Sequence, residues 1–414
     1  MRPQLGALAL SMCLLLLGAA APARAAAPVV DLGSFIPNAL NNKGQVVGDI
    51  VDPDDDSAPG HAALWSGGTL TPLAEPAGAT ASDAYAINAS GRIAGDAADA
   101  AGQIHALFWD GAPGTPQQIG PLWGGPEDFS QAVGVDTAGE VVGQTLDASA
   151  RSFGFLRPPG GGLTRVGDAD RDGGSTTVAG ITPDGTKMLG HVGTAEHNGA
   201  ATGWYLWPSP GASGVKLDIT PFIHGSFLPG SALAPQYGNS LASDGTVLGY
   251  KGDTAQDRVY YLRLPSGDET TVGGLVGHNA VNAKHTVAGT IAASDGMGNT
   301  IPHAAIWKPD GGGTVVDLNS LLPAGSGYIL FDALAINDNG DIAGLAAHNN
   351  QTVGFLLPAG YVVDSTGDTP DAAQGDGACL TPQGTCTLRA ALQEVSAGPP
   401  ATARGRARAW RSGR

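Results

Sequence analysis

The stretch AINASGRIAGD, from Ala86 to Asp96, decides the fold of this chain. Two short apolar runs flank an Asn-x-x-Gly turn, which is the pattern of a β-hairpin whose glycine takes a positive φ. Counting this one, seven related stretches occur, and the first steps between them are 47, 48 and 46 residues, so the chain is built from repeats. The residues at the turn position are Gly44, Gly91, Gly139, Gly185, Gly245, His285 and Gly340.

A second phrase follows the hairpin in each repeat. It reads HAALW from His61, HALFW from His105 and HAAIW from His303, with looser versions in the other four repeats. A further apolar run completes six of the repeats. The seventh lacks one, whereas VVDLGS at residues 29–34 nearly copies the completing run VVDLNS at residues 315–320.

Four strands in a unit of this length predict an all-β protein, a seven-bladed β-propeller with four-stranded blades, closed by the N-terminal strand. Closure would also remove an unpaired blade edge. An open β-solenoid is the alternative, but it would not need the first strand to supply what the last repeat lacks.

The predicted connections assign the loops to two faces. Short hairpin turns lie on one face, while the loops between the second and third strands and the loops between blades lie on the other. The loops of this second face differ in every repeat, so we call it the variable face. Binding is expected there because variable loops on a rigid scaffold commonly carry function.

The N-terminus predicts export. Arg2 precedes a long apolar run and the small-residue site Ala23-Arg24-Ala25, so residues 1–25 are expected to be a signal peptide. No later segment is long and apolar enough to span a membrane. The mature chain is therefore expected to be secreted, periplasmic or on the cell surface.

The charge balance limits the classes of partner that the chain can bind. The chain has 21 basic and 38 acidic residues, and loss of Arg2 and Arg24 with the leader would take the net charge from −17 to −19. Such a chain repels nucleic acid and anionic membranes, and suits neutral or cationic partners and divalent cations. Carbohydrate or protein is the expected partner.

The repeat phrases AIN-x-x-G-x-I-x-G and H-A-x-x-W resemble the HAF-repeat family of secreted bacterial proteins, over residues 29–358. That resemblance implies an extracellular repeat protein of no settled biochemical activity. We therefore expect a HAF-repeat propeller over residues 26–360.

The following stretch, residues 365–394, resembles a CSLREA-type segment, with Cys379, Cys386, Leu388 and Arg389 on its motif. In that family it commonly opens a long β-helix, but here the chain ends within twenty residues of Glu394. We expect a CSLREA-like segment over 361–398 and a disordered basic tail over 399–414. The two cysteines enclose a short loop, and in an oxidising compartment a disulfide is expected rather than a metal pair.

The acidic stretch DADRDGG predicts a metal site. Asp168, Asp170 and Asp172 alternate before a glycine, which suits calcium because this ion takes several oxygen ligands around a sharp turn. The bidentate acid usual at the twelfth position is absent, since Ala179 stands there. A solvated acidic turn is the equal alternative.

Aromatic residues mark a possible ligand site in the longest insertion, which we assign to the loop leading into the fifth blade. Phe222, His224, Phe227 and Tyr237 could stack on a sugar or a peptide, or fold back on their own blade.

The repeated histidines and tryptophans favour a structural role. His61, His105 and His303 belong to different blades, so each is expected to be satisfied by a neighbouring backbone group at a strand end rather than to converge on a metal. The tryptophans are expected to pack blade against blade. They are Trp65, Trp109, Trp207 and Trp307.

Two functions remain open. The first is a non-catalytic binding or scaffolding module, stabilised by calcium if the acidic loop binds it. The second is a propeller-type extracellular glycan-acting enzyme, a hydrolase or lyase, with carboxylates such as Asp128, Asp184 or Asp338 meeting near the axis. Buried acids with raised pKa values near the axis would favour the enzyme, and an axis lined by alanine and glycine would favour the binding module.

Overall fold

The computed structural model describes most of the repeat region and a small part of the C-terminal segment. The described residues are 29–52, 55, 58–119, 129–146, 152–167, 175–193, 203–221, 240–252, 257–295, 297–322, 325–359, 367–370, 381–382, 387–390 and 393.

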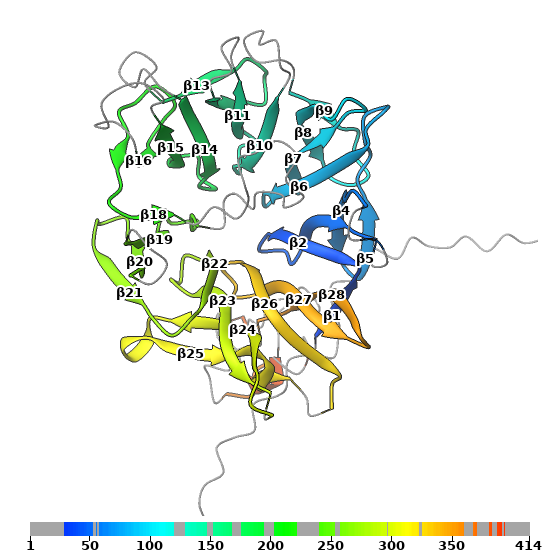
Figure 1. The fold of residues 1–414 in the computed structure, drawn as a ribbon, viewed down its shortest axis with the longest axis vertical. Helices are drawn as coiled ribbons and strands as arrows, with labels where there is room; N and C mark the ends of the chain where they lie inside the picture. The colour runs from blue at the N-terminus through cyan, green and yellow to red at the C-terminus, as the bar shows by residue number, and fades with distance from the viewer. Residues whose placement is uncertain are drawn as a thin grey trace, which may run out of the picture.

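Seven four-stranded antiparallel sheets form a ring around a central axis (Figure 1). Blade 1 contains β2 (Phe35–Leu40), β3 (Val46–Ile50), β4 (His61–Ser66) and β5 (Thr69–Pro72); blade 2 contains β6 (Ala81–Ile87), β7 (Arg92–Ala98), β8 (Ile104–Asp110) and β9 (Gln117–Gln118); blade 3 contains β10 (Ser130–Val135), β11 (Val141–Leu146), β12 (Ser152–Arg157) and β13 (Thr164–Val166). Blade 4 contains β14 (Ser175–Ile181), β15 (Met188–Gly193), β16 (Gly203–Trp207) and β17 (Val215–Lys216); blade 5 contains β18 (Thr220–Pro221), β19 (Val247–Lys251), β20 (Val259–Arg263) and β21 (Glu269–Val272). Blade 6 contains β22 (Gly277–Val281), β23 (Val287–Ser294), β24 (Thr300–Lys308) and β25 (Thr314–Asp317), with the short 3₁₀ helices η1 (Asp310–Gly312) and η2 (Leu318–Leu321); blade 7 contains β26 (Tyr328–Ile336), β27 (Ile342–His348), β28 (Gln351–Leu357) and β1 (Val30–Gly33).

The N-terminal strand completes the last blade. Strand β1 pairs with β28, with Val30 opposite Leu356 and Asp31 opposite Phe355. The Asp31 carboxylate also accepts a 2.8 Å hydrogen bond from the Tyr328 hydroxyl of β26, so the first strand is bound to two strands of blade 7. The prediction of a seven-bladed propeller closed by the N-terminal strand is confirmed.

The hairpin turns have the predicted backbone conformation. All six turn glycines of the repeat have a positive φ, between 70° and 99°. His285, which replaces the glycine in blade 6, is also left-handed, with a φ of 59°. Its imidazole Nε2 lies 3.1 Å from the Asp244 carboxylate of blade 5.

A second repeated glycine has a different function, which the sequence analysis did not address. In six blades the innermost strand carries a bulge, and there its backbone approaches the second strand closely. A Cβ built on Gly289 would lie 2.0 Å from the Gly277 carbonyl oxygen, so no side chain fits. Equivalent contacts occur at Gly48, Gly95, Gly143, Gly190, Gly249 and Gly344.

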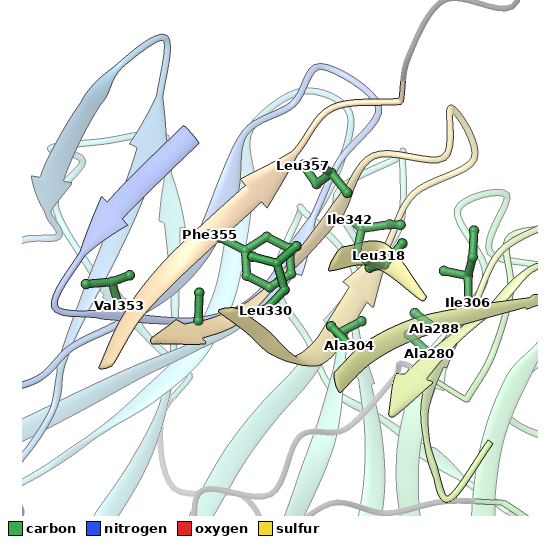
Figure 2. Close-up of a cluster of buried hydrophobic side chains, with 12 residues drawn as sticks. Ala280, Ala288, Ala304, Ile306, Leu318, Leu330, Ile342, Val353, Phe355 and Leu357 are labelled. Carbon is green, nitrogen blue, oxygen red and sulfur yellow. The ribbon is translucent and has the colours of Figure 1, made fainter. Parts of the chain in front are cut away.

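The core lies between blades rather than within them. Figure 2 shows one such cluster, in which Leu330 and Phe355 of blade 7 meet Ala304 and Ile306 of blade 6. The repeated tryptophans lie in clusters of the same kind. Trp109 is fully buried against Val47 and neighbouring residues of blade 1, and its Nε1 donates to the Ala74 carbonyl at 2.7 Å.

Trp65, Trp207 and Trp307 likewise pack against the preceding blade. The prediction that the tryptophans join blade to blade is confirmed.

The predicted place of the longest insertion is wrong. Thr220 and Pro221 already form the innermost strand of blade 5, where they pair with Tyr250 and Gly249. After the insertion, Ser240 accepts a hydrogen bond from the Leu248 amide, which continues the same strand pair. Residues 222–239 therefore take the place of the single bulge residue found in the other blades, because the register before and after them is that of one interrupted strand. Phe222, His224, Phe227 and Tyr237 themselves lie outside the described residues.

In the described part of the chain, no helix is long and apolar enough to cross a membrane.

Candidate functional site

A cavity of about 230 Å³ lies at the axis on the hairpin-turn face, and we call it the axial mouth. Every blade contributes to it through the end of its innermost strand. Its wall combines small residues, because Ala or Gly opens most of the repeated hairpins, with larger side chains such as Leu40, Tyr85 and Ile87. The small residues include Ala39, Ala86, Gly134, Gly180, Ala242, Ala280 and Ala335.

The repeated asparagines join the blades around this mouth. The Asn41 side-chain amide donates to the Asn88 carbonyl of blade 2 at 3.0 Å, and the Asn88 amide donates to the Asp136 carbonyl of blade 3 at 2.7 Å. On the other side, Asn282 donates to the Asn337 carbonyl and Asn337 donates to the Asn41 carbonyl. The repeated asparagines of blades 1, 2, 6 and 7 therefore form inter-blade hydrogen bonds at the rim of the mouth.

The carboxylates named from the sequence do not pair here. Asp338 lines the mouth, where its carboxylate accepts from the Ser243 hydroxyl at 2.6 Å and from the Ala283 amide at 2.9 Å. The Asp184 carboxylate bonds within its own turn, to Thr182 and Thr186, and these hydrogen bonds lower its pKa to about 2. Asp128 lies outside the described residues.

Three other acids form a buried carboxyl cluster between blades 1 and 2. They are Asp49 of β3, Asp83 of β6 and Asp96 of β7; Asp49 is 6% exposed and Asp96 is 3% exposed. Asp83 hydrogen-bonds both Asp49 and the Tyr85 hydroxyl, and Asp96 also bonds Tyr85. Because Asp83 and Asp96 are register partners on adjacent strands, the fold brings their side chains together.

Burial controls the protonation of this cluster. It raises the pKa of Asp83 to about 6, even though hydrogen bonds to Tyr85 and Asp49 and the charge of His61 lower it. Burial, followed by repulsion from Asp83, raises the pKa values of Asp49 and Asp96 well above the ordinary value. The cluster therefore holds protons at pH values where exposed carboxyls are ionised.

Amide side chains connect the cluster to the neighbouring blades. Asn38 of blade 1 donates to the Asp49 carboxylate at 2.8 Å and to the Ala84 carbonyl of blade 2 at 3.1 Å. Gln131 of blade 3 donates to Asp96 at 2.8 Å. The network thus spans blades 1, 2 and 3.

Blade 6 repeats this arrangement. Asn279, at the same bulge position as Asn38, donates to the Asp332 carboxylate at 2.6 Å and to the Ala333 carbonyl at 2.9 Å, both in blade 7. The bond that recurs across the interface runs from the bulge asparagine to a carbonyl of the next blade, and it joins neighbouring blades.

The repeated histidines do not converge. The His61 imidazole lies 2.7 Å from the Glu75 carboxylate, and His303 lies 2.8 Å from Asp317. His105 lies 3.3 Å from Asp99. Among the described residues, no group of three or more His, Cys, Asp or Glu side chains is arranged to hold a metal ion. Each of these histidines contacts its own local carboxylate rather than the backbone group expected from the sequence, and such a separate local contact suits a structural role.

The calcium and disulfide predictions cannot be compared with these contacts. Asp168, Asp170 and Asp172 fall between β13 and β14, as expected for a loop between blades, but they lie outside the described residues. Cys379 and Cys386 also lie outside them. In the described part of the C-terminal segment, Arg389 forms an ion pair with Asp368.

One sequence signal could have located the carboxyl cluster. The residue after the second repeated glycine is Asp in blades 1 and 2 and Gln in blade 3, at Asp49, Asp96 and Gln144. Ionisable and amide residues are unusual at such a position in a strand, directly after the second repeated glycine. The sequence could therefore have marked these residues, but only strand pairing shows that they face one another.

Comparisons with known proteins bear on the fold. No protein-family model and no curated protein matches the sequence. Similar solved structures include TolB from Acinetobacter baumannii (9% identity, TM-score 0.37), matched over 76% of this chain and 63% of that chain. A puromycin hydrolase is 15% identical over 81% of this chain and 52% of that chain, with a TM-score of 0.46. The β-propeller domain of the Trilobed protease from Pyrococcus furiosus is 11% identical over 79% of this chain and 93% of that domain, with a TM-score of 0.44.

This chain thus spans less than two thirds of the TolB chain and about half of the puromycin hydrolase.

Proposed function

We propose that this chain is a secreted or cell-surface repeat protein that acts as a non-catalytic binding module, with a carbohydrate or protein group entering the axial mouth. This proposal rests on the axial mouth, because residues from all seven blades line this cavity and the complete ring is needed to form it. The carboxylate among its lining residues, Asp338, is already hydrogen-bonded to the Ser243 hydroxyl and the Ala283 amide and is not paired with Asp184. The leader and the resemblance to HAF-repeat proteins support an extracellular location.

The carboxyl cluster is consistent with this function as an inter-blade clamp. Its acids contact one another and the amides of Asn38 and Gln131, whereas paired acids in a glycosidase face each other across a substrate cleft. The variable-face loops remain a second predicted binding surface, stabilised by calcium if Asp168, Asp170 and Asp172 bind it.

The test uses the mature chain on an array of immobilised oligosaccharides and peptides. Ala89, which is exposed and lines the mouth, is replaced in an Ala89→Trp variant that fills the entrance. Ala283, the corresponding residue of blade 6, does not line the cavity, so Ala283→Trp is the matched control. Binding that Ala89→Trp abolishes and Ala283→Trp retains would support the proposal; equal binding by both variants would refute the mouth as the site.

A glycan-acting enzyme is the second candidate, and one observation favours it. Asp83 is on an innermost strand, is partly exposed and has a pKa of about 6, which suits a general acid. Mass spectrometry of the array oligosaccharides after incubation would detect cleavage. Turnover that disappears in Asp83→Asn would establish the enzyme and overturn the binding module.

A further inference from the structure

The third blade departs from the repeat at a buried position. In blades 1, 2, 4 and 6 the residue two positions before the second repeated glycine pairs with an inter-blade tryptophan. In blade 3 the corresponding pair is Val141 and Arg157. A charged guanidinium therefore stands in the interface with blade 2, where these four blades place an apolar ring.

Arg157 lies close to a second arginine, Arg92. Its guanidinium carbon lies 4.6 Å from the centre of the buried Phe108 ring, and that of Arg92 lies 5.0 Å from the centre of the same ring. Burial, followed by repulsion from Arg92, lowers the pKa of Arg157, whereas Asp110 raises it. The two arginines are thus close enough to repel one another.

The hydrogen-bond acceptors around Arg92 and Arg157 do not neutralise the two guanidinium charges. Arg92 donates through Nε to the Asp110 carboxylate and through Nη1 to the Gly139 carbonyl at 2.8 Å. Within the described part of the chain, Nη1 of Arg157 is buried and has no hydrogen-bond acceptor. One carboxylate, half exposed to solvent, therefore faces two guanidinium groups, in a chain whose net charge is −17.

A cavity opens at this point on the hairpin-turn face. It has a volume of about 220 Å³ and is lined by Arg92 and Asp110, the backbone of the glycine-containing turns, and the hydroxyl-bearing residues Ser90 and Thr137. Arg157 does not line the cavity itself, but its guanidinium contacts the same Phe108 ring as that of Arg92. We call the whole arrangement the arginine cavity.

We propose that the arginine cavity binds an oxyanion of the phosphate, sulfate or carboxylate class. Arg92 would contact the anion directly, since the planar guanidinium fork matches such groups. Arg157 would act as a positioning residue, supplying unneutralised positive charge from outside the cavity lining. This inference stands apart from the proposed function, because it concerns a different cavity and a different ligand class.

The charge of Arg157 gives the size of the expected effect. At a separation of about 8 Å and an effective dielectric constant of about 40, loss of one charge weakens binding of a monoanion about fivefold, and of a dianion more. Arg157→Trp restores the residue that the other blades use, and Arg157→Gln is a second variant if the larger ring does not pack. Arg263 occupies the same register position in blade 5, so Arg263→Trp is the matched control.

The experiment is isothermal titration of the full chain with sodium phosphate, sulfate, acetate and chloride at matched low ionic strength. We expect saturable heat for phosphate or sulfate but not for chloride, weakened about fivefold or more in the Arg157 variants and unchanged in Arg263→Trp. Saturable binding of acetate instead would assign a carboxylate ligand to the same cavity. Absence of saturable heat with all three oxyanions, equal heat with chloride, or unchanged affinity in the Arg157 variants would overturn the proposal.

Discussion

Replacement of Asp83 by asparagine should change how stability depends on pH. The pKa of Asp83 is about 6 in the folded chain, mainly because burial disfavours its charged form, against 3.8 for an ordinary aspartate. Between these two pH values the folded chain keeps a proton that the unfolded chain releases. The free energy of unfolding must therefore fall as pH rises through this window, and level off above the folded pKa.

The size of this effect follows from the two values. At about 1.36 kcal/mol per pKa unit, the difference between 3.8 and about 6 corresponds to about 3 kcal/mol of stability lost between pH 4 and pH 7. Asparagine has nearly the same shape and carries no charge, so Asp83→Asn should escape this loss. Asp49 and Asp96 add to the effect in the same direction, because repulsion from Asp83 raises their pKa values.

The assay is urea unfolding of both proteins, followed by tryptophan fluorescence, at pH values from 4 to 8. The stability of Asp83→Asn relative to the unmodified chain should rise by about 3 kcal/mol across this range. Asp184→Asn is the control whose stability difference from the unmodified chain should stay constant from pH 4 to pH 8. Hydrogen bonds to Thr182 and Thr186 lower the pKa of Asp184 to about 2. Its contribution to the free energy of unfolding is therefore present above pH 3.8 and is lost only as the pH falls toward 2. A stability difference for Asp83→Asn that does not vary with pH would refute the argument that burial holds a proton on this carboxyl.

Three further changes test the repeat, the rim and the acidic loop. Gly289→Ala should lower the free energy of unfolding by about 3 kcal/mol or more, because its Cβ would overlap the Gly277 carbonyl. The control Gly160→Ala meets open space and should change the free energy of unfolding by less than about 0.5 kcal/mol in the same urea assay. Asn88→Ala should cost about 1–3 kcal/mol, because it leaves the neighbouring blade's buried carbonyl without its donor; a cost near zero would show that the rim bonds do not stabilise the ring. Calcium should raise the melting temperature of the mature chain but not that of Asp170→Ala, and equal responses by scanning calorimetry would reduce the acidic loop to a solvated turn.

The blade-to-blade contacts explain why the ring needs both apolar and polar joints. Apolar clusters such as the one containing Leu330 and Phe355 supply non-directional burial at each interface. The side-chain amides of Asn38 and Asn279 add directional hydrogen bonds to carbonyls of the next blade, across two of these interfaces. A directional contact fixes the angle between neighbouring blades, which a seven-fold ring requires if its last strand is to meet its first.

The sequence by itself determined the architecture, because strand alternation and turn glycines are local signals. Repetition at about 47 residues set the number of blades, and the copy of the blade 6 run at residues 29–34 predicted the closing strand β1. The tryptophan and histidine roles followed from the same repetition, since a residue present once per unit is best explained by a contact made once per unit.

Only the tertiary structure decided which chemical groups meet. Asp49 and Asp83 are separated by 34 positions along the chain, and Arg92 and Arg157 by 65, so no spacing rule joins them. Their encounter depends on strand register and on the packing of one blade against the next, which also explains why the insertion after Pro221 was assigned to the wrong connection. The local pattern specifies the strands, because the alternation of apolar and polar residues is a property of residues that are neighbours in the sequence. The burial and the pKa of a side chain depend instead on groups that only the closed ring brings together.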